Sequence, residues 1–215
     1  MKITKLEHSG VVLEKDGRRL VFDPVEFEET LPNLEEVAAI IITHKHGDHL
    51  QKAQIEKILA QNPTAKLFAV GDAGDELPKA ELLADDEVLE IGGFSLRMFG
   101  HDHAEVVDGE VPCQNIGVVV DEMLVNPGDS FDLPEMDRQI EVLLVPSAAP
   151  WCKVSEGMEY IKLAKPKMVI PVHNAVLSEL GNSFNNNWLK RACDEVGAEL
   201  KALAVGESLE IEQEP

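Results

Sequence analysis

A chain of 215 residues with 44% hydrophobic and 27% charged side chains has the composition of a soluble globular protein, and its length suits one domain, 1–215. Its net charge of −21, from 19 basic and 40 acidic residues, argues against nucleic acid and against an anionic membrane surface as partners. No stretch approaches the roughly 18 apolar residues that span a bilayer, and the charged N-terminus does not resemble a secretion signal.

The three cysteines are widely spaced and form no CxxC pair. This pattern indicates reduced thiols and predicts a cytoplasmic protein. The composition leaves the oligomeric state open, with a homo-oligomer as one alternative.

The first third of the chain is predicted to open with a β-hairpin, because Asp16-Gly17 is a strong turn pair between two strand-like runs. After the hairpin, a continuous apolar run predicts a strand that is covered on both faces. Apolar residues at helical spacing then predict a helix that ends near Pro63. In chain order the expected elements are strands at 3–14, 18–24 and 37–43, a helix at 51–63 and a strand at 66–70.

The rest of the chain is predicted to continue with two hairpins, which turn at Gly92-Gly93 and Asp121-Glu122. Strands and helices then alternate. The expected elements are hairpins at 86–100 and 115–129, a strand at 140–147, a helix at 155–167 with Ser155 as its N-cap, a strand at 167–173, and a helix at 185–197 with an apolar face of Trp188, Leu189, Ala192, Cys193 and Val196 and an end at Gly197. This order fits an α/β (α+β) chain with two sheets face to face and helices outside, although composition alone does not separate it from other mixed folds.

Three of the seven histidines lie in one short segment, ITHKHGDHL. His44 and His46 are two residues apart, so in extended backbone both rings point to the same side and can reach one cation. Gly47 is expected to let the chain turn sharply, so that Asp48 and His49 sit at the entry of the next helix. Imidazole and carboxylate groups are ligands that Zn²⁺, Mn²⁺ and Fe²⁺ accept. The alternative is that Asp48 is only a helix N-cap and the histidines are polar loop residues.

These residues resemble the HxHxDH motif of the metallo-β-lactamase superfamily, which runs here from His44 to His49. Other segments agree, in the expected order, over residues 1 to about 200. They are LVFDP with Asp23, FGHDHAEVV with a further histidine, NPGDS with Asp129, and VIPVHN with His173. The resemblance implies the αββα four-layer sandwich of the metallo-β-lactamase fold. Within the superfamily, the chain looks most like the small stand-alone metal-dependent hydrolases.

The resemblance also implies a site for two divalent ions, with zinc expected and manganese or iron as alternatives. The implied ligands are His44, His46 and His103 for one ion, Asp48, His49 and His173 for the other, and Asp129 as the bridge. Two such ions lower the pKa of a shared water, and the resulting hydroxide would attack a small-molecule ester, lactone, amide or phosphoester. Asp48 and Asp129 are the expected catalytic carboxylates.

The segment GHDH offers two histidines, His101 and His103, for a single ligand position. Related small hydrolases carry an acid, a histidine and an alanine in this place, which matches Asp102, His103 and Ala104. The resemblance therefore favours His103 as the ligand and leaves His101 at the pocket rim.

Four more residues are candidates for supporting the ligands or contacting the substrate. They are His8, Asp23, Trp151 and Lys153. His8 is expected at a strand position, facing either the site or the protein core. Asp23 is expected to orient a ligand imidazole, unless it is only a turn residue. Trp151 and Lys153 follow a strand in an irregular loop, where they would either line the pocket mouth or form ordinary surface.

Two other functions stay open. A non-catalytic member of the superfamily would bind the same ions for stability or regulation, and its ligands would look the same in the sequence. A di-iron redox protein of the superfamily is disfavoured, because such proteins carry glutamate where this chain has His46 and also need a flavin partner domain.

Overall fold

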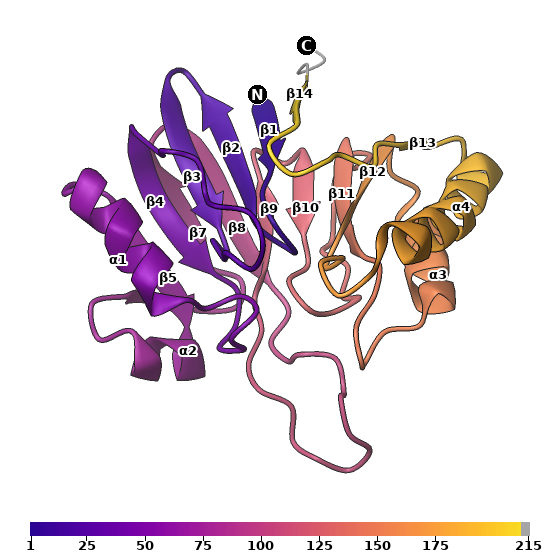
Figure 1. Cartoon of the computed structure of the whole chain (residues 1–215), viewed down its shortest axis with the longest axis horizontal. Coiled ribbons are helices and arrows are strands. Elements are labelled where there is room, and N and C mark those ends of the chain that lie inside the picture. Colours follow the sequence, from indigo (N-terminus) through magenta and orange to yellow (C-terminus); the bar gives the residue numbers. More distant parts are fainter. Residues whose placement is uncertain (212–215) are drawn as a thin grey trace.

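The computed structural model describes residues 1–211, and its two seven-stranded sheets lie face to face between two pairs of helices (Figure 1). In spatial order the first sheet is β14 (Ser208–Glu210), β1 (Lys2–Lys5), β2 (Val11–Lys15), β3 (Arg18–Phe22), β4 (Val37–Ile42), β5 (Lys66–Val70) and β6 (Glu81–Leu83). The second sheet is β13 (Glu199–Leu200), β12 (Met168–Val172), β11 (Val142–Pro146), β10 (Leu124–Asn126), β9 (Gly117–Val120), β8 (Phe94–Phe99) and β7 (Val88–Ile91).

The helices form the outer layers (Figure 1). They are α1 (Lys52–Gln61) and α2 (Gly71–Glu76) beside the first sheet, and α3 (Val154–Ala164) and α4 (Glu179–Val196) beside the second. The predicted αββα sandwich is confirmed. Among residues 1–211, no helix is both long enough and apolar enough to cross a membrane.

Apolar side chains from both sheets fill the space between them. Phe22 and Ile41 of the first sheet belong to the same buried cluster as Leu96 and Leu144 of the second. A separate cluster lies on the outer face of the second sheet. It joins Val145 of β11 to Tyr160 and Ile161 of α3 and to Leu189 and Cys193 of α4. Burial of these side chains is the main force that holds the four layers together.

Strand direction places one set of strand ends along a common edge. β1 is antiparallel to β2, which is antiparallel to β3, and β3 to β6 are parallel. In the second sheet β8 and β10 flank the antiparallel β9, and β10 to β13 are parallel. The carboxyl ends of β1, β3 and β4 therefore share one edge of their sheet, and those of β8, β10, β11 and β12 share one edge of theirs.

Most of the predicted strands are confirmed. The run 66–70 forms β5, and the run 37–43 forms β4 without its last residue. Turns at Gly92-Gly93 and at Asp121-Glu122 separate β7 from β8 and β9 from β10, and all four residues have positive φ. At Asp16-Gly17 φ is 52° and 74°, as a two-residue hairpin turn requires.

The predicted strand at 3–14 is wrong, because the chain reverses between β1 and β2. The Leu6 N–H donates to the Gly10 carbonyl at 2.8 Å, and the Gly10 N–H donates to the Glu7 carbonyl at 2.8 Å. His8 lies in this turn with φ of 53°, so the strand position expected for it is also wrong. The alternating pattern hid the turn because both halves of the run are genuinely strands.

Three smaller corrections concern helices. The N-cap of α3 is Lys153 and not Ser155, since the Glu156 carboxylate accepts the Lys153 backbone N–H at 2.6 Å. α4 begins earlier than predicted, after Ser178, and ends at Gly197 as predicted. Trp188 is 47% exposed, so it does not share the buried face of α4. The short elements α2, β6, β13 and β14 were not predicted.

Candidate metal centre

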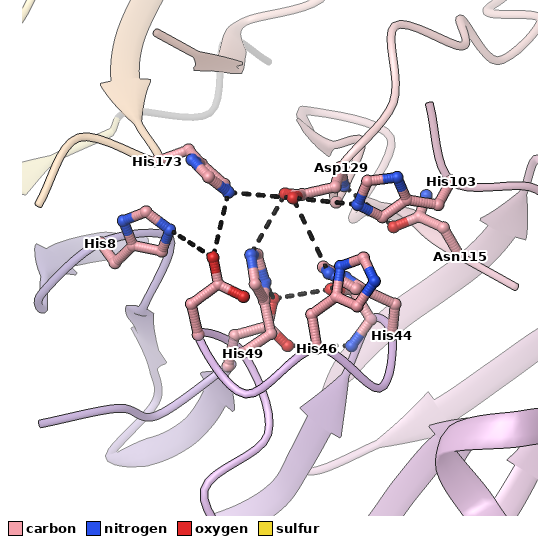
Figure 2. Close-up of polar contacts among 12 residues, drawn as sticks. His8, His44, His46, His49, His103, Asn115, Asp129 and His173 are labelled. Carbon is pink, nitrogen blue, oxygen red and sulfur yellow. Dashed lines mark hydrogen bonds and ion pairs between the residues drawn. The ribbon is translucent and has the colours of Figure 1, made fainter. Parts of the chain in front are cut away.

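All the candidate site residues follow the carboxyl ends of strands that share the edges described above. The strands and the residues after them are β1 with His8, β3 with Asp23, β4 with His44, His46, Asp48 and His49, β8 with His101 and His103, β10 with Asp129, β11 with Trp151 and Lys153, and β12 with His173. Residues from distant parts of the sequence thus meet between the two sheets (Figure 2).

Asp129 is the centre of this arrangement, and four imidazoles direct Nε2 toward its carboxylate (Figure 2). The Nε2 atom lies 2.9 Å from an Asp129 oxygen in His173, 3.2 Å in His49, 3.3 Å in His103 and 3.7 Å in His44. The carboxylate and all four rings are almost completely buried. A single buried carboxylate thus lies within reach of histidines from both sheets.

The opposite ring nitrogen, Nδ1, is held by an acceptor in each of these four histidines. In His49 it donates to Asp23 Oδ2 at 2.8 Å, and in His44 to Thr43 Oγ1 at 3.1 Å. In His103 and His173 it donates to backbone carbonyls at 2.5 Å and 2.7 Å. Because a neutral imidazole carries one hydrogen, these partners leave the lone pair on Nε2.

These Nε2 lone pairs accept no hydrogen bond from the described part of the protein. Within residues 1–211, Nε2 of His44, His49, His103 and His173 and Oδ1 of Asp129 are buried without a hydrogen bond of acceptable geometry. Unpaired buried polar atoms are rare, and each is costly unless an ion or water satisfies it. Divalent ions fit this donor set, because neutral imidazole nitrogen and carboxylate oxygen are their common ligands.

The donor atoms fall into two groups, and the atoms of each group lie within 4.8 Å of one another. The groups are His44, His46, His103 and Asp129, and His8, Asp48, His49 and His173. The division matches the two predicted ligand sets, with Asp129 close to members of both. The second group also contains His8, which the sequence analysis did not count as a ligand.

The buried carboxylate and imidazoles of this cluster shift one another's pKa values. Burial alone would raise the pKa of Asp129, but the neighbouring imidazoles, His49 first and then His103 and His173, hold that pKa well below its usual value. Burial opposes a charge on His49 as well, yet Asp129 and Asp23 raise the pKa of His49 well above its usual value. In His44, burial outweighs everything else and lowers the pKa. A buried negative carboxylate therefore attracts positive charge at this point.

Asp23 has the geometry of a residue that orients a ligand. Oδ1 accepts the Thr43 backbone N–H at 2.9 Å, and Oδ2 accepts the Thr43 hydroxyl at 2.7 Å and the ring of His49 at 2.8 Å. Its φ is 44°, and His173 has φ of 55°. Such conformations are unfavourable for residues other than glycine and tend to gather at functional sites.

The loop after β4 differs in detail from the prediction. Asp48 and His49 lie in a turn before α1, whose N-cap is Gln51, so Asp48 is not the helix cap. The φ of Gly47 is not in the left-handed region, and a Cβ there would meet nothing within 4 Å. A glycine is therefore not required for the turn.

The peripheral candidates lie at different distances from the centre. The side chain of His101 is 63% exposed and its Nδ1 donates to Asp102, whereas His103 is buried beside Asp129. Trp151 donates from Nε1 to Asp129 Oδ2 at 3.2 Å, so it contacts the carboxylate directly. Lys153 is exposed at the start of α3.

Three residues at the site were missed by the sequence analysis. Asn115 is fully buried, and its Oδ1 accepts the Asp129 backbone N–H at 2.9 Å. Thr43 links Asp23 to His44, and Cys113 Sγ lies 3.6 Å from His46 Nε2. Thr43 adjoins the histidine motif and could have been suspected. Asn115 stands opposite Asp129 in the hairpin predicted at 115–129, so it could also have been suspected. Cys113 carries no local signal, because it reaches His46 only through the pairing of distant segments.

The family model described as Beta-lactamase superfamily domain matches residues 2–173. The chain belongs to this superfamily. One curated relative is Protein Rv0786c of Mycobacterium tuberculosis, which is 33% identical to this chain over 197 residues. The match covers 83% of this chain and 86% of the relative. The UPF0173 metal-dependent hydrolase of Carboxydothermus hydrogenoformans is 27% identical, with 80% and 84% covered.

Solved structures share the fold. Igni18, a metallo hydrolase from Ignicoccus hospitalis, has a TM-score of 0.75 at 19% identity and covers 99% of both chains. CmlA, a diiron β-hydroxylase from Streptomyces venezuelae, has a TM-score of 0.72 at 14% identity, covering 98% of this chain and 54% of its own. The family-model match confirms the predicted superfamily, and these structural likenesses confirm the predicted fold.

Proposed function

We propose that this superfamily member is a metal-dependent hydrolase with a two-ion centre that acts on a small molecule carrying an ester, lactone, amide or phosphoester bond. The observation that supports it most is the set of unpaired, buried Nε2 atoms around Asp129. Four rings are held so that their lone pairs converge on one carboxylate, and a purely structural cluster would have no need for this. Relatives that carry the name metal-dependent hydrolase support the same reading.

The residues that would hold the ions are those of the two groups except His8. Asp129 would be shared between the two groups. When bound, a pair of divalent ions would polarise a substrate oxygen and lower the pKa of a water molecule. Zinc is the expected metal, with manganese and iron as alternatives, because all three accept imidazole and carboxylate ligands.

The protein itself would contribute orientation and exclusion of water. Asp23, Thr43 and the two backbone carbonyls fix the ring orientations, so the donor atoms need not rearrange when ions enter. Trp151 packs edge-on against His103 and His173, with ring centroids 5.5 Å and 5.8 Å away, and shields one side of the centre. Asp48, whose side chain is 38% exposed, is the carboxylate best placed to meet both an ion and a substrate proton. The cytoplasm stays our proposed compartment.

The test is metal reconstitution followed by a substrate panel. Protein stripped with a chelator would be titrated with Zn²⁺, Mn²⁺ or Fe²⁺, analysed for bound metal, and assayed on an aryl ester, a lactone, an amide and a phosphodiester, with Asp129→Ala as the control. We expect two ions per chain and turnover that depends on them. Ions without turnover on any bond class would point to the non-catalytic alternative, and failure to bind ions would overturn both.

A further inference from the structure

His8 lies in the second group of donor atoms, but its ring is hydrogen-bonded in the opposite sense to the other buried histidines. The backbone N–H of Ala175 donates to Nδ1 of His8 at 3.2 Å. Nδ1 is therefore an acceptor and carries no hydrogen. In a neutral imidazole the hydrogen must then be on Nε2, which has no lone pair left for an ion.

Nε2 of His8 faces the carboxylate of Asp48. It lies 3.3 Å from Asp48 Oδ2 without the alignment of a full hydrogen bond, and within residues 1–211 it has no other hydrogen-bond partner. The contact is longer than an ordinary hydrogen bond, and the acceptor role of Nδ1 is what fixes the tautomer. The same Asp48 oxygen is 3.6 Å from Nε2 of His173, so it lies between His8 and a predicted ligand.

The turn that carries His8 is braced by buried polar contacts. Lys5, which is 1% exposed, donates from Nζ to the backbone carbonyls of Leu6 and His8 at 2.5 Å each. The His8 carbonyl also accepts the backbone N–H of His173 at 3.1 Å. A Cβ on Gly10 would lie 2.9 Å from Leu6 Cβ, so the turn closes too tightly for a side chain there. The φ of 53° at His8 costs energy, and these contacts maintain it.

We propose that His8 is a positioning residue, which donates a hydrogen bond from Nε2 to Asp48 and thereby holds this carboxylate toward the second ion, without binding the ion itself. The proposal rests on the proposed two-ion centre. Asp48 needs such a partner because its side chain is partly exposed and would otherwise be free to turn toward water. His8 also joins the two sheets at the site, since it accepts two hydrogen bonds from backbone N–H groups of the loop after β12.

A matched pair of substitutions separates the two ring nitrogens. In His8→Gln the amide nitrogen can take the place of Nε2 and still donate to Asp48. In His8→Asn the amide oxygen can take the place of Nδ1 and still accept from Ala175, but nothing is left to donate to Asp48. Calorimetric titration of chelator-stripped protein with Zn²⁺ would measure the affinity of each site. We expect His8→Asn to bind two ions, with the second about 10–100-fold weaker and the first unchanged, and His8→Gln to stay close to the parent.

Two readouts can overturn this role. X-ray absorption of the Zn²⁺-loaded proteins counts imidazole ligands, and the count should be equal in the parent and in both variants. One fewer imidazole in both variants would make His8 a ligand. Equal losses of melting temperature in both variants, with the ratio of the two affinities unchanged, would make it merely structural.

Nitrogen NMR of the parent tests the tautomer directly, with or without ions. The expected spectrum shows the His8 hydrogen on Nε2, and a hydrogen on Nδ1 would overturn the proposal. Because this measurement works on stripped protein, it distinguishes failure of the His8 role from failure of the two-ion centre.

Discussion

The indole N–H of Trp151 donates to Oδ2 of Asp129 across 3.2 Å, so the aromatic wall of the site is bonded to its central carboxylate. The same oxygen lies 2.9 Å from Nε2 of His173. A tryptophan that the sequence indicated only as a pocket wall or surface residue thus contacts the group on which both ligand sets converge. Its indole ring fixes where Oδ2 points, and the bond disappears if the ring nitrogen is removed.

Replacing this indole tests that contact. Trp151→Phe keeps an aromatic ring against His103 and His173 but removes the donor, and we expect metal affinity to fall by about 10–100-fold, as for other residues that orient a ligand. Metal titration monitored by calorimetry gives the size of the loss.

Fluorescence supplies an independent readout, because the chain has only two tryptophans. Metal titration should change the emission of the parent and of Trp188→Phe, since Trp188 lies on α4 away from the site, but not the emission of Trp151→Phe. An emission that stays constant in Trp188→Phe would mean that the indole of Trp151 does not sense the ions.

Removing Asp129 should disable both groups at once. We expect Asp129→Ala to lose more than the roughly 10–100-fold in metal affinity typical of a supporting residue, at both sites, because four imidazoles converge on this carboxylate. The variant should still fold, since the apolar clusters lie elsewhere and circular dichroism can verify it. Asp129→Asn keeps an oxygen acceptor for Trp151 without the charge. If either variant kept both ions at parental affinity, Asp129 would not bridge them.

The choice between the two histidines of GHDH is also open to test. His103 is buried with Nε2 3.3 Å from Asp129, whereas the side chain of His101 is 63% exposed. We expect His103→Ala to lose an ion and His101→Ala to retain two, with activity changed only modestly. Metal analysis of the two variants side by side decides it. The reverse order would mean that the ligand lies two residues earlier.

The strands and the motif could be predicted because their signals are local. The pairs Asp16-Gly17 and Gly92-Gly93 indicate turns, because their residues tolerate positive φ. Apolar runs in the sequence indicate β4 and β5. The histidine motif is equally local, and the superfamily resemblance supplied the distant ligands. Short edge strands gave no such signal. β14 has three residues, and it exists because it pairs with β1 from the opposite end of the chain.

The supporting residues could not be predicted, for the same reason. Asn115 holds the Asp129 backbone because β9 and β10 pair, and the sequence indicated that hairpin but not the contact of the Asn115 amide with the site. The orientation of His8 depends on Ala175, 167 residues away, and on the buried amine of Lys5. No period or spacing in the sequence encodes contacts of that length.

Lys5 carries a prediction of its own, because burial lowers the pKa of its amine to about 7 despite the opposing effect of Glu7. Between pH 7 and the ordinary lysine pKa of 10.5, the unfolded chain therefore keeps a proton that the folded chain has lost. Stability from this group rises with pH across that window and is lowest below it, by at most about 1.4 kcal/mol for each pH unit.

The difference in free energy of unfolding between the parent and Lys5→Met isolates this effect. We expect the parent to gain on the order of 1 kcal/mol per pH unit relative to Lys5→Met between about pH 7.5 and 9.5. Urea unfolding of chelator-stripped protein at several pH values measures it, with Lys52→Met on the exposed face of α1 as the control for loss of a charge. A difference that does not change with pH would show that the carbonyls of Leu6 and His8 keep Lys5 protonated in the folded protein.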